Sequence, residues 1–230
     1  MSKQSYEEIR EAYRKEAAET LEFHEYTQLV NQDGCEVWRC QNGSSTIYAF
    51  DIMMTRFGIA IVGDIDNMTF RVGSSYGIAF LAGDDVGYYI HSKLDDHCKE
   101  RELDAEILKS SMIEWIKDHV EQKFPEWYVP AFRPDQTSEF SVWLHAKWYN
   151  MAESDHRVWD WYHLLDQVDD LICGNDIHAV HTFLNENSQN LCEEWWDHTF
   201  TKPSESLMHR LYMVNHAAKE IMKIKGAANG

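Results

Sequence analysis

The 230-residue chain lacks the short motifs that mark the common enzyme classes. It has no GxSxG nucleophile elbow, no P-loop, no GxGxxG dinucleotide fingerprint and no CxxC pair. No run of about 18 apolar residues occurs, so we expect no membrane span. The N-terminal residues, MSKQSYEEIREAYRKE, have no apolar signal-peptide centre, and the five cysteines are scattered, so we expect an intracellular protein with reduced thiols.

Basic residues are scarce as well. The chain has 21 lysines and arginines against 39 aspartates and glutamates, which gives a formal net charge of -18. Direct nucleic-acid binding needs clustered lysines and arginines that neutralise phosphates, so we expect none. Thirteen of the acids lie between Asp135 and Asp197, where only Lys147 and Arg157 oppose them. This excess either steers the chain towards a basic partner or keeps a tryptophan-rich helical region in solution.

The first half of the chain has the pattern of a helix followed by short strands. Apolar residues at helical spacing predict a helix over residues 4–24, and the residues at 31–34 break it. The continuous apolar run at 58–62 predicts a strand buried on both faces, and alternation at 68–72 predicts a half-exposed one. A further strand is expected at 88–90.

The dipeptide Asn42-Gly43 is typical of a two-residue hairpin turn. Such a turn places Arg39 opposite Thr46. Side-chain alternation then puts Arg39, Tyr48 and Phe50 on one face of the sheet and Trp38 on the other.

The second half of the chain has a helical pattern. It predicts helices in the segment 101–120 and near 136–150, 155–173, 176–187, 190–199 and 204–225. Three prolines fall within residues 125–135, which we interpret as a linker between a region 1–124 and an acidic, tryptophan-rich helical region 136–230, or as a turn within one continuous domain. The predicted class is α+β: an N-terminal helix, a small antiparallel meander sheet and a mostly helical C-terminal half.

The strands carry a set of cationic and aromatic residues in an otherwise acidic protein. Aromatic rings stack on nucleobases, and arginine and lysine meet phosphates, so this set would suit a small nucleotide. An amphipathic sheet with ordinary surface cations is the alternative. The candidate ligand-binding residues are Trp38, Arg39, Tyr48, Phe50, Asp64, Arg71, Tyr88, Tyr89 and Lys93.

His178 and His181 are the only metal-ligand candidates that the spacing favours. Three residues apart on a helix, they project from one face, and several aspartates lie nearby in sequence. The segment lacks the four-residue spacing and the glutamate of a zincin motif, so ordinary surface histidines are the alternative. We expect no cofactor.

The segment 34–93 also carries a family pattern: WRC, a Gly-Ser turn, a Y-x-F segment, a GD turn and a later YY-x-x-K. In this pattern the chain resembles a group of uncharacterised tailed-phage accessory proteins. The matching positions include most of the candidate residues above. The resemblance implies a phage product in the host bacterial cytoplasm, and many such products neutralise host defence by binding, often as homo-oligomers.

Three functions follow as hypotheses. The first is a non-catalytic phage counter-defence protein that sequesters a small nucleotide immune signal through the sheet residues. The second is an acidic, anti-CRISPR-like inhibitor that binds a basic nucleic-acid channel of a host defence complex. The third is a metal-dependent hydrolase built on His178 and His181.

Overall fold

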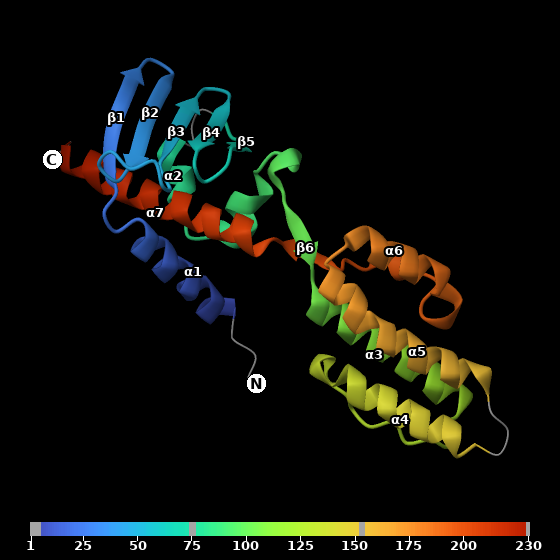
Figure 1. Ribbon diagram of the computed structural model, residues 1–230. Coiled ribbons are helices and arrows are strands. Elements are labelled where there is room, and N and C mark those ends of the chain that lie inside the picture. The colour runs from blue at the N-terminus through green and yellow to red at the C-terminus, as the bar shows by residue number, and fades with distance from the viewer. Residues whose placement is uncertain (1–5, 74–76, 152–154, 229–230) are drawn as a thin grey trace. The chain divides into compact units, whose positions relative to one another are not determined.

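The computed structural model describes residues 6–73, 77–151 and 155–228. It has the predicted α+β class, with an N-terminal helix, an antiparallel meander sheet and a mostly helical C-terminal half (Figure 1). The chain divides into two compact units. Unit 1 comprises residues 1–100 and 203–230, and unit 2 comprises residues 101–202.

The chain does not divide at the predicted linker, residues 125–135. This segment lies inside unit 2, where Val129 is buried and the Phe132 ring stacks on Phe140 with centroids 4.7 Å apart. The last helix, α7 (Glu205–Ala228), follows unit 2 in sequence but belongs to unit 1. Prolines indicate where a helix stops, but they do not indicate which core a later helix joins.

Unit 1 contains a five-stranded sheet whose strands are adjacent in sequential order. They are β1 (Glu25–Gln32), β2 (Cys35–Gln41), β3 (Phe50–Thr55), β4 (Gly58–Gly63) and β5 (Met68–Phe70). The sequence pattern does not predict β1, because this edge strand is polar and most of its side chains are exposed. The sequence pattern predicts that both faces of β4 are buried. In the structure only Ile59 and Ile61 of this strand belong to the core, and Val62 is 46% exposed.

The hairpin predicted at Asn42-Gly43 is wrong. The two-residue turn lies at Asp33-Gly34, between β1 and β2, where Gly34 adopts a φ of 78° that favours glycine. The longer loop 42–49 joins β2 to β3.

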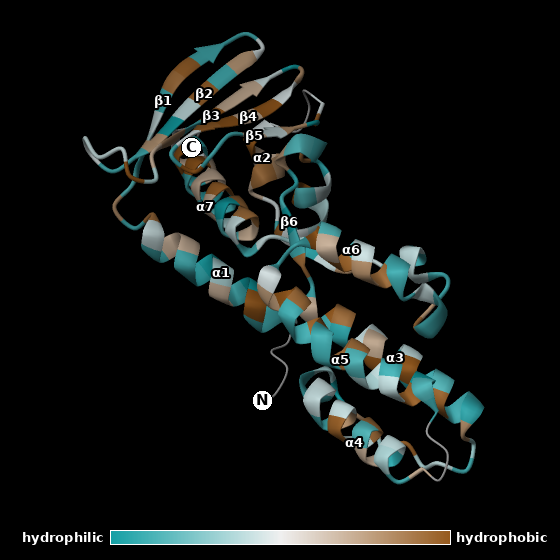
Figure 2. Cartoon of the chain, turned by 45° about the vertical axis from the view of Figure 1, so that its right-hand side comes forward, coloured by the Kyte–Doolittle hydropathy of each residue, from teal (hydrophilic) through white to brown (hydrophobic). Residues whose placement is uncertain are grey.

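This change of turn shifts the register of β2 and β3. Arg39 pairs with Asp51 and Cys40 with Phe50, whereas the predicted turn requires Arg39 opposite Thr46. Phe50 therefore shares a face with Cys40, and Arg39 lies on the opposite face. Along β1 and β2, hydrophobic and hydrophilic residues are interspersed (Figure 2).

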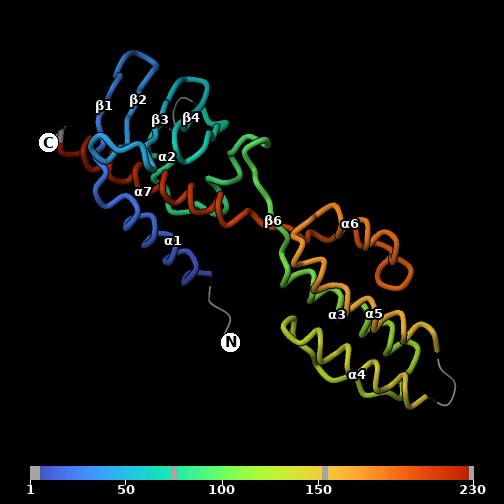
Figure 3. Tube along the Cα trace, viewed as in Figure 1, coloured from blue at the N-terminus to red at the C-terminus, as the bar shows by residue number. Residues whose placement is uncertain are grey.

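Helices cover one face of this sheet. They are α7 and α2 (Gly77–Leu81). A third helix, α1 (Tyr6–Thr20), packs beside α7 although the two are far apart in sequence (Figure 3). The core between sheet and helices includes Ile52, Ile61, Met68, Leu207, Leu211 and Tyr212, all at most 1% exposed. Burying each such side chain stabilises the fold by about 1.5–3 kcal/mol.

The segment after α2 is not the predicted strand at 88–90. Residues Val86–Ile90 form a π-helical turn instead. The edge of β5 is closed by the residues that follow, since Phe70 bridges to Leu94 and the Asp95 N–H donates to the Thr69 carbonyl at 2.9 Å.

Unit 2 is mainly helical. Its helices are α3 (Ala105–Lys123), α4 (Thr137–Tyr149), α5 (His156–Gly174) and α6 (Ile177–Glu186), and β6 (Arg101–Leu103) pairs with β7 (Thr201–Pro203). The predicted helix at 190–199 is absent, and two 3₁₀ turns, Ser188–Asn190 and Trp195–Asp197, flank an irregular stretch there. Aromatic rings fill much of the core, including Trp115, Trp161 and Phe140.

Within the part of the chain that the structure describes, no helix is both long enough and apolar enough to cross a membrane.

Candidate functional site

Two of the nine candidate ligand-binding residues are core residues. Trp38 and Phe50 are 4% and 2% exposed and belong to the core beneath the sheet. The Trp38 indole N–H donates to the Glu36 carboxylate at 2.6 Å. Protein atoms surround both rings, so neither ring is available to stack on a ligand.

The two candidate arginines are paired with carboxylates. Arg39 makes two 2.9 Å hydrogen bonds to Asp51 on the exposed face of the sheet. Arg71 pairs with Asp95, which also accepts from the Thr69 hydroxyl. The hydrogen bond from Thr69 and the Arg71 guanidinium hold the pKa of Asp95 below its usual range.

Tyr88, Tyr89 and Lys93 lie together on and just after the π-helical turn. The Lys93 ammonium lies 5.4 Å from the centroid of the Tyr89 ring, and that ring meets Phe80 edge-on. The Tyr88 side chain is 75% exposed.

The cationic residues do not converge on one pocket. Lys93 lies beside Arg71 at the β5 edge, since the Arg71 N–H donates to the Lys93 carbonyl at 2.8 Å. Arg39 is on β2, three strand positions from β5, which corresponds to about 14 Å at the usual strand spacing. Arg39, which is paired with Asp51, therefore lies apart from the group formed by Arg71, Tyr89 and Lys93 at the β5 edge.

Tyr48 and Asp64, by contrast, line one cavity of unit 1, which we call the Tyr48 cavity. Its volume is 470 Å³. Its walls come from α1, the loop 42–49, the loop after β4 and the start of α7. The lining residues are Tyr13, Glu16, Tyr48, Asp64, Ile65, Asp66, Glu205, Ser206, His209, Arg210 and Met213.

Two loops are fixed in unusual backbone conformations at this cavity. Tyr48 has a φ of 54° and Asp66 a φ of 66°, both in the left-handed region that residues other than glycine rarely adopt. The Tyr48 N–H donates to the Asp64 carboxylate at 2.8 Å, and the Asp64 N–H donates to the Ala49 carbonyl at 2.8 Å. Such strained residues persist only where surrounding contacts hold them.

The helix α7 supplies the basic side chains of the cavity. Arg210 is 8% exposed and pairs with the carboxylates of Asp66 and Glu100, so its charge is already compensated. His209 Nε2 lies 2.8 Å from a Glu16 carboxylate oxygen. Sequence reasoning missed these α7 residues because they are more than 140 positions from the loops that they meet, and no local signal reports such a distance.

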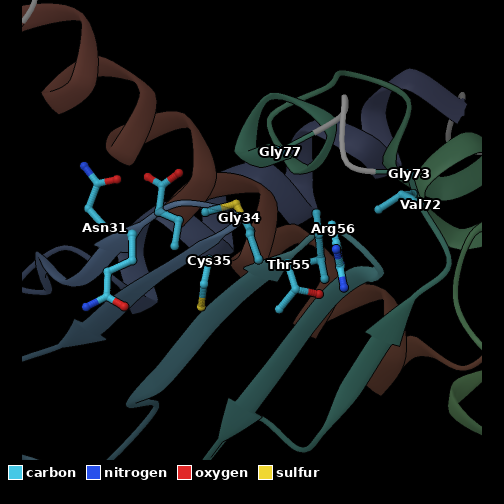
Figure 4. Close-up of a pocket in the computed structure, with 12 residues that line it drawn as sticks. Asn31, Gly34, Cys35, Thr55, Arg56, Val72, Gly73 and Gly77 are labelled. Carbon is cyan, nitrogen blue, oxygen red and sulfur yellow. The ribbon is translucent and has the colours of Figure 1, made fainter.

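A second cavity in unit 1, of 200 Å³, lies near the Asp33-Gly34 turn (Figure 4). Cys35, Thr55 and Arg56 line it together with backbone at several glycines. Its carboxylate, Glu36, is already held by Lys225 at 2.7 Å. The carboxylate of this cavity is therefore already neutralised, and the free thiol of Cys35 also lines it.

The described residues bring no metal site together. His178 and His181 lie on α6, but no group of three histidine, cysteine, aspartate or glutamate side chains in the described ranges could hold an ion. Asp176, the acid next to them in sequence, accepts from the His178 and Ala179 N–H groups and so caps α6. The His181 ring packs 5.4 Å from that of Trp195.

Unit 2 presents unpaired carboxylates to solvent. On α5, Asp160, Asp166 and Asp170 are exposed. Asp166 and Asp170 lie opposite the buried stripe that contains Trp161 and Leu165, and Asp160 lies at its side. We call these three residues the α5 acidic stripe. Within the described parts of the chain, none of them makes an ion pair, whereas Asp169 between them pairs with Lys109.

A second exposed acidic group surrounds Trp196. Glu193, Glu194 and Asp197 are exposed and unpaired within the described residues, and the Trp196 ring is 62% exposed. Trp195 packs against the core of unit 2, as expected for adjacent tryptophans that point in different directions. We call residues 193–197 the Trp196 loop.

No protein-family model, no curated protein and no solved structure shows significant similarity to the chain.

Proposed function

We propose that the chain is a non-catalytic binding protein whose acidic unit 2 occupies a basic, nucleic-acid-binding surface of a protein partner. The observation that carries this proposal is the unpaired acidity of the α5 acidic stripe and the Trp196 loop. Acids that stabilised the fold would have basic partners, as Asp155 does in Lys123 and Asp169 in Lys109.

The carboxylates of the α5 acidic stripe are spaced so that basic side chains of a partner protein can bind them. Asp166 and Asp170 are one helical turn apart, about 6 Å along the helix axis, and both face solvent. Two neighbouring anions on a helix, with a third on its flank, present to lysine and arginine the same kind of charged target as a nucleic-acid backbone. An exposed tryptophan among carboxylates is the residue type that anchors interfaces.

The resemblance to tailed-phage accessory proteins supplies the biological setting of this proposal. In that setting the partner is a host defence complex in the bacterial cytoplasm, and occupation of its nucleic-acid channel blocks its action. No catalytic group is required.

Affinity capture tests the proposal. The purified chain is immobilised and incubated with bacterial lysate, and the retained proteins are quantified by mass spectrometry. We expect basic nucleic-acid-binding proteins that excess duplex DNA displaces. Binding should also fall steeply as the salt concentration rises from 0.1 to 0.5 M. Salt screens charges: the Debye length shrinks from about 10 Å at 0.1 M to about 3 Å at 1 M.

Two variants of equal charge separate the stripe from net charge. In the first, Asp160→Asn, Asp166→Asn and Asp170→Asn are combined. In the second, Glu22→Gln, Glu25→Gln and Asp33→Asn are combined; these are exposed acids of unit 1 that make no ion pair within the described residues. Capture should fall at least about tenfold in the first and stay unchanged in the second. Equal capture by both variants, or no displacement by DNA, contradicts the proposal.

Sequestration of a nucleotide by the sheet residues stays a prediction. Its test is equilibrium dialysis of the chain against cyclic and linear nucleotides, with Arg39→Ala and Lys93→Ala as variants. Weaker binding in both variants would favour sequestration over the acidic inhibitor.

A further inference from the structure

We propose that the Tyr48 cavity of unit 1 is a binding site for a small aliphatic cation that carries an ammonium or guanidinium group, such as a polyamine or agmatine. The site is separate from the acidic surfaces of unit 2 and does not depend on them.

The first argument is the size of the cavity. Its volume of 470 Å³ falls within the range of about 300–1,000 Å³ typical of small-molecule sites. All its walls belong to unit 1, so the site is complete within that unit.

The second argument is the charge of the lining. Four carboxylates face two basic residues, namely Glu16, Asp64, Asp66 and Glu205 against His209 and Arg210. Arg210 is held by two carboxylates, one of them from Glu100 outside the lining. Its Nε–H also donates to the Ser206 carbonyl at 3.1 Å, so all three of its nitrogens have protein partners and two carboxylates compensate its charge. The lining therefore favours a cation.

The third argument is the number of hydrogen-bond acceptors in the lining. A Glu16 carboxylate oxygen lies 2.8 Å from His209 Nε2, and the Asp64 carboxylate accepts from the Tyr48 N–H at 2.8 Å. A carboxylate offers about four acceptor sites, so these contacts leave room for the N–H groups of a ligand.

The fourth argument is the aromatic part of the wall. Tyr13 lies against Tyr212 with the rings stacked at 5.3 Å, so its position is fixed by the core. Tyr48 is 46% exposed, and its backbone is held by Asp64. Cations bind over tyrosine faces, and the apolar chain of an aliphatic amine packs against Ile65 and Met213 of the same lining.

Isothermal titration calorimetry on the full chain tests this site. Agmatine and spermidine are the probes, and AMP is an anionic control. We expect saturable binding of a cation at a single site and no binding of AMP. Because the whole chain is acidic, nonspecific attraction of cations has to be separated from binding in the cavity.

Matched variants make that separation. Glu16→Gln removes a lining carboxylate of α1, whereas Glu19→Gln removes an exposed carboxylate on the same helix that pairs with Lys15 at 3.7 Å. Glu16→Gln should weaken binding about tenfold, and Glu19→Gln should leave it unchanged. Tyr48→Leu should weaken it about threefold and Tyr88→Leu should not.

Equal affinities for Glu16→Gln and Glu19→Gln would reduce the binding to diffuse attraction and overturn the site. Binding of AMP in preference to both amines would overturn it as well, and so would the absence of any heat at millimolar probe. Thermal unfolding of each variant establishes that it is folded; both glutamates are exposed on α1, so neither change disturbs the core.

Discussion

The backbone N–H of Tyr48 donates a 2.8 Å hydrogen bond to the side chain of Asp64, and this bond joins two loops that are 16 residues apart. On the other side of the same residue, His24 Nε2 hydrogen-bonds to the Tyr48 carbonyl at 3.2 Å. Tyr48 is thereby held in a left-handed conformation that costs roughly 1–2 kcal/mol for a residue with a Cβ. The cavity wall depends on this arrangement.

Asp64→Ala should release the loop 42–49. The Tyr48 N–H loses its acceptor, so we expect faster hydrogen exchange at that amide and a loss of about 1 kcal/mol in the free energy of unfolding by urea. Glu22→Gln, an exposed change in the same unit, is the control and should alter neither quantity. Unchanged exchange at Tyr48 would mean that other contacts hold the loop.

Gly63→Ala should destabilise unit 1 strongly. Gly63 has a φ of 153°, and a Cβ built there would lie 2.3 Å from the Ala49 carbonyl oxygen and 2.6 Å from the Phe50 Cα. Because backbone atoms cannot move aside cheaply, we expect a loss of more than about 2 kcal/mol in urea unfolding. Gly43→Ala is the matched comparison: its φ is also positive, at 53°, but nothing lies within 4 Å. It should cost about 1 kcal/mol, and equal losses would contradict the close approach at Gly63.

The ion pair of Asp95 should make stability depend on pH in a definite direction. The pKa of Asp95 is lowered in the folded state by Thr69 and then by Arg71, so the unfolded chain binds the proton more readily. The stabilisation is present above the unfolded pKa of about 3.9 and is lost as pH falls through the folded pKa. Asp95→Asn should therefore be less stable than the unmodified chain at pH 7, and the difference should narrow as pH falls below about 3.9, as measured by urea unfolding. A difference that does not change with pH would mean that packing, and not charge, accounts for it.

Much of the fold follows from local sequence signals. The helices α3, α5 and α7 carry apolar stripes, and Ser204 caps α7, accepting from the Leu207 N–H at 3.1 Å. The strand β5 shows the expected alternation, and β4 is a strand as predicted although only one of its faces is buried. These elements are predictable because the spacing of apolar residues within each one indicates its type.

The errors arise where two local signals compete or where the deciding contact is distant. Asp33-Gly34 and Asn42-Gly43 are both good hairpin dipeptides, and only pairing of the polar strand β1 decides between them. The position of the turn sets the register of the strands that carry Arg39 and Phe50. Because the turn was predicted at the wrong dipeptide, these two side chains were predicted on the same face of the sheet. The α7 side of the Tyr48 cavity was beyond prediction because the chain returns to unit 1 only after unit 2.

Removal of unit 2 should leave unit 1 folded. Within unit 1 the Ser204 N–H donates to the Glu100 carbonyl at 3.0 Å, so a short glycine-serine linker can replace residues 101–203. We expect a cooperative urea transition and the β-sheet signals of unit 1 in NMR spectra. A chain ending at residue 202 is the control and should lose those signals, because Leu207, Leu211 and Tyr212 are missing from its core. Failure of the shortened chain to fold would mean that unit 1 requires unit 2.

The position of α7 after unit 2 also fixes an order of events on the ribosome. Residues 1–100 emerge with the buried face of their sheet uncovered, and the helix that covers it is translated more than a hundred residues later. At roughly 5–20 residues per second, that delay is on the order of 6 to 26 s. Unit 2, whose segments are contiguous, completes its core first. The nascent sheet is therefore the part of this protein that most needs a chaperone during synthesis.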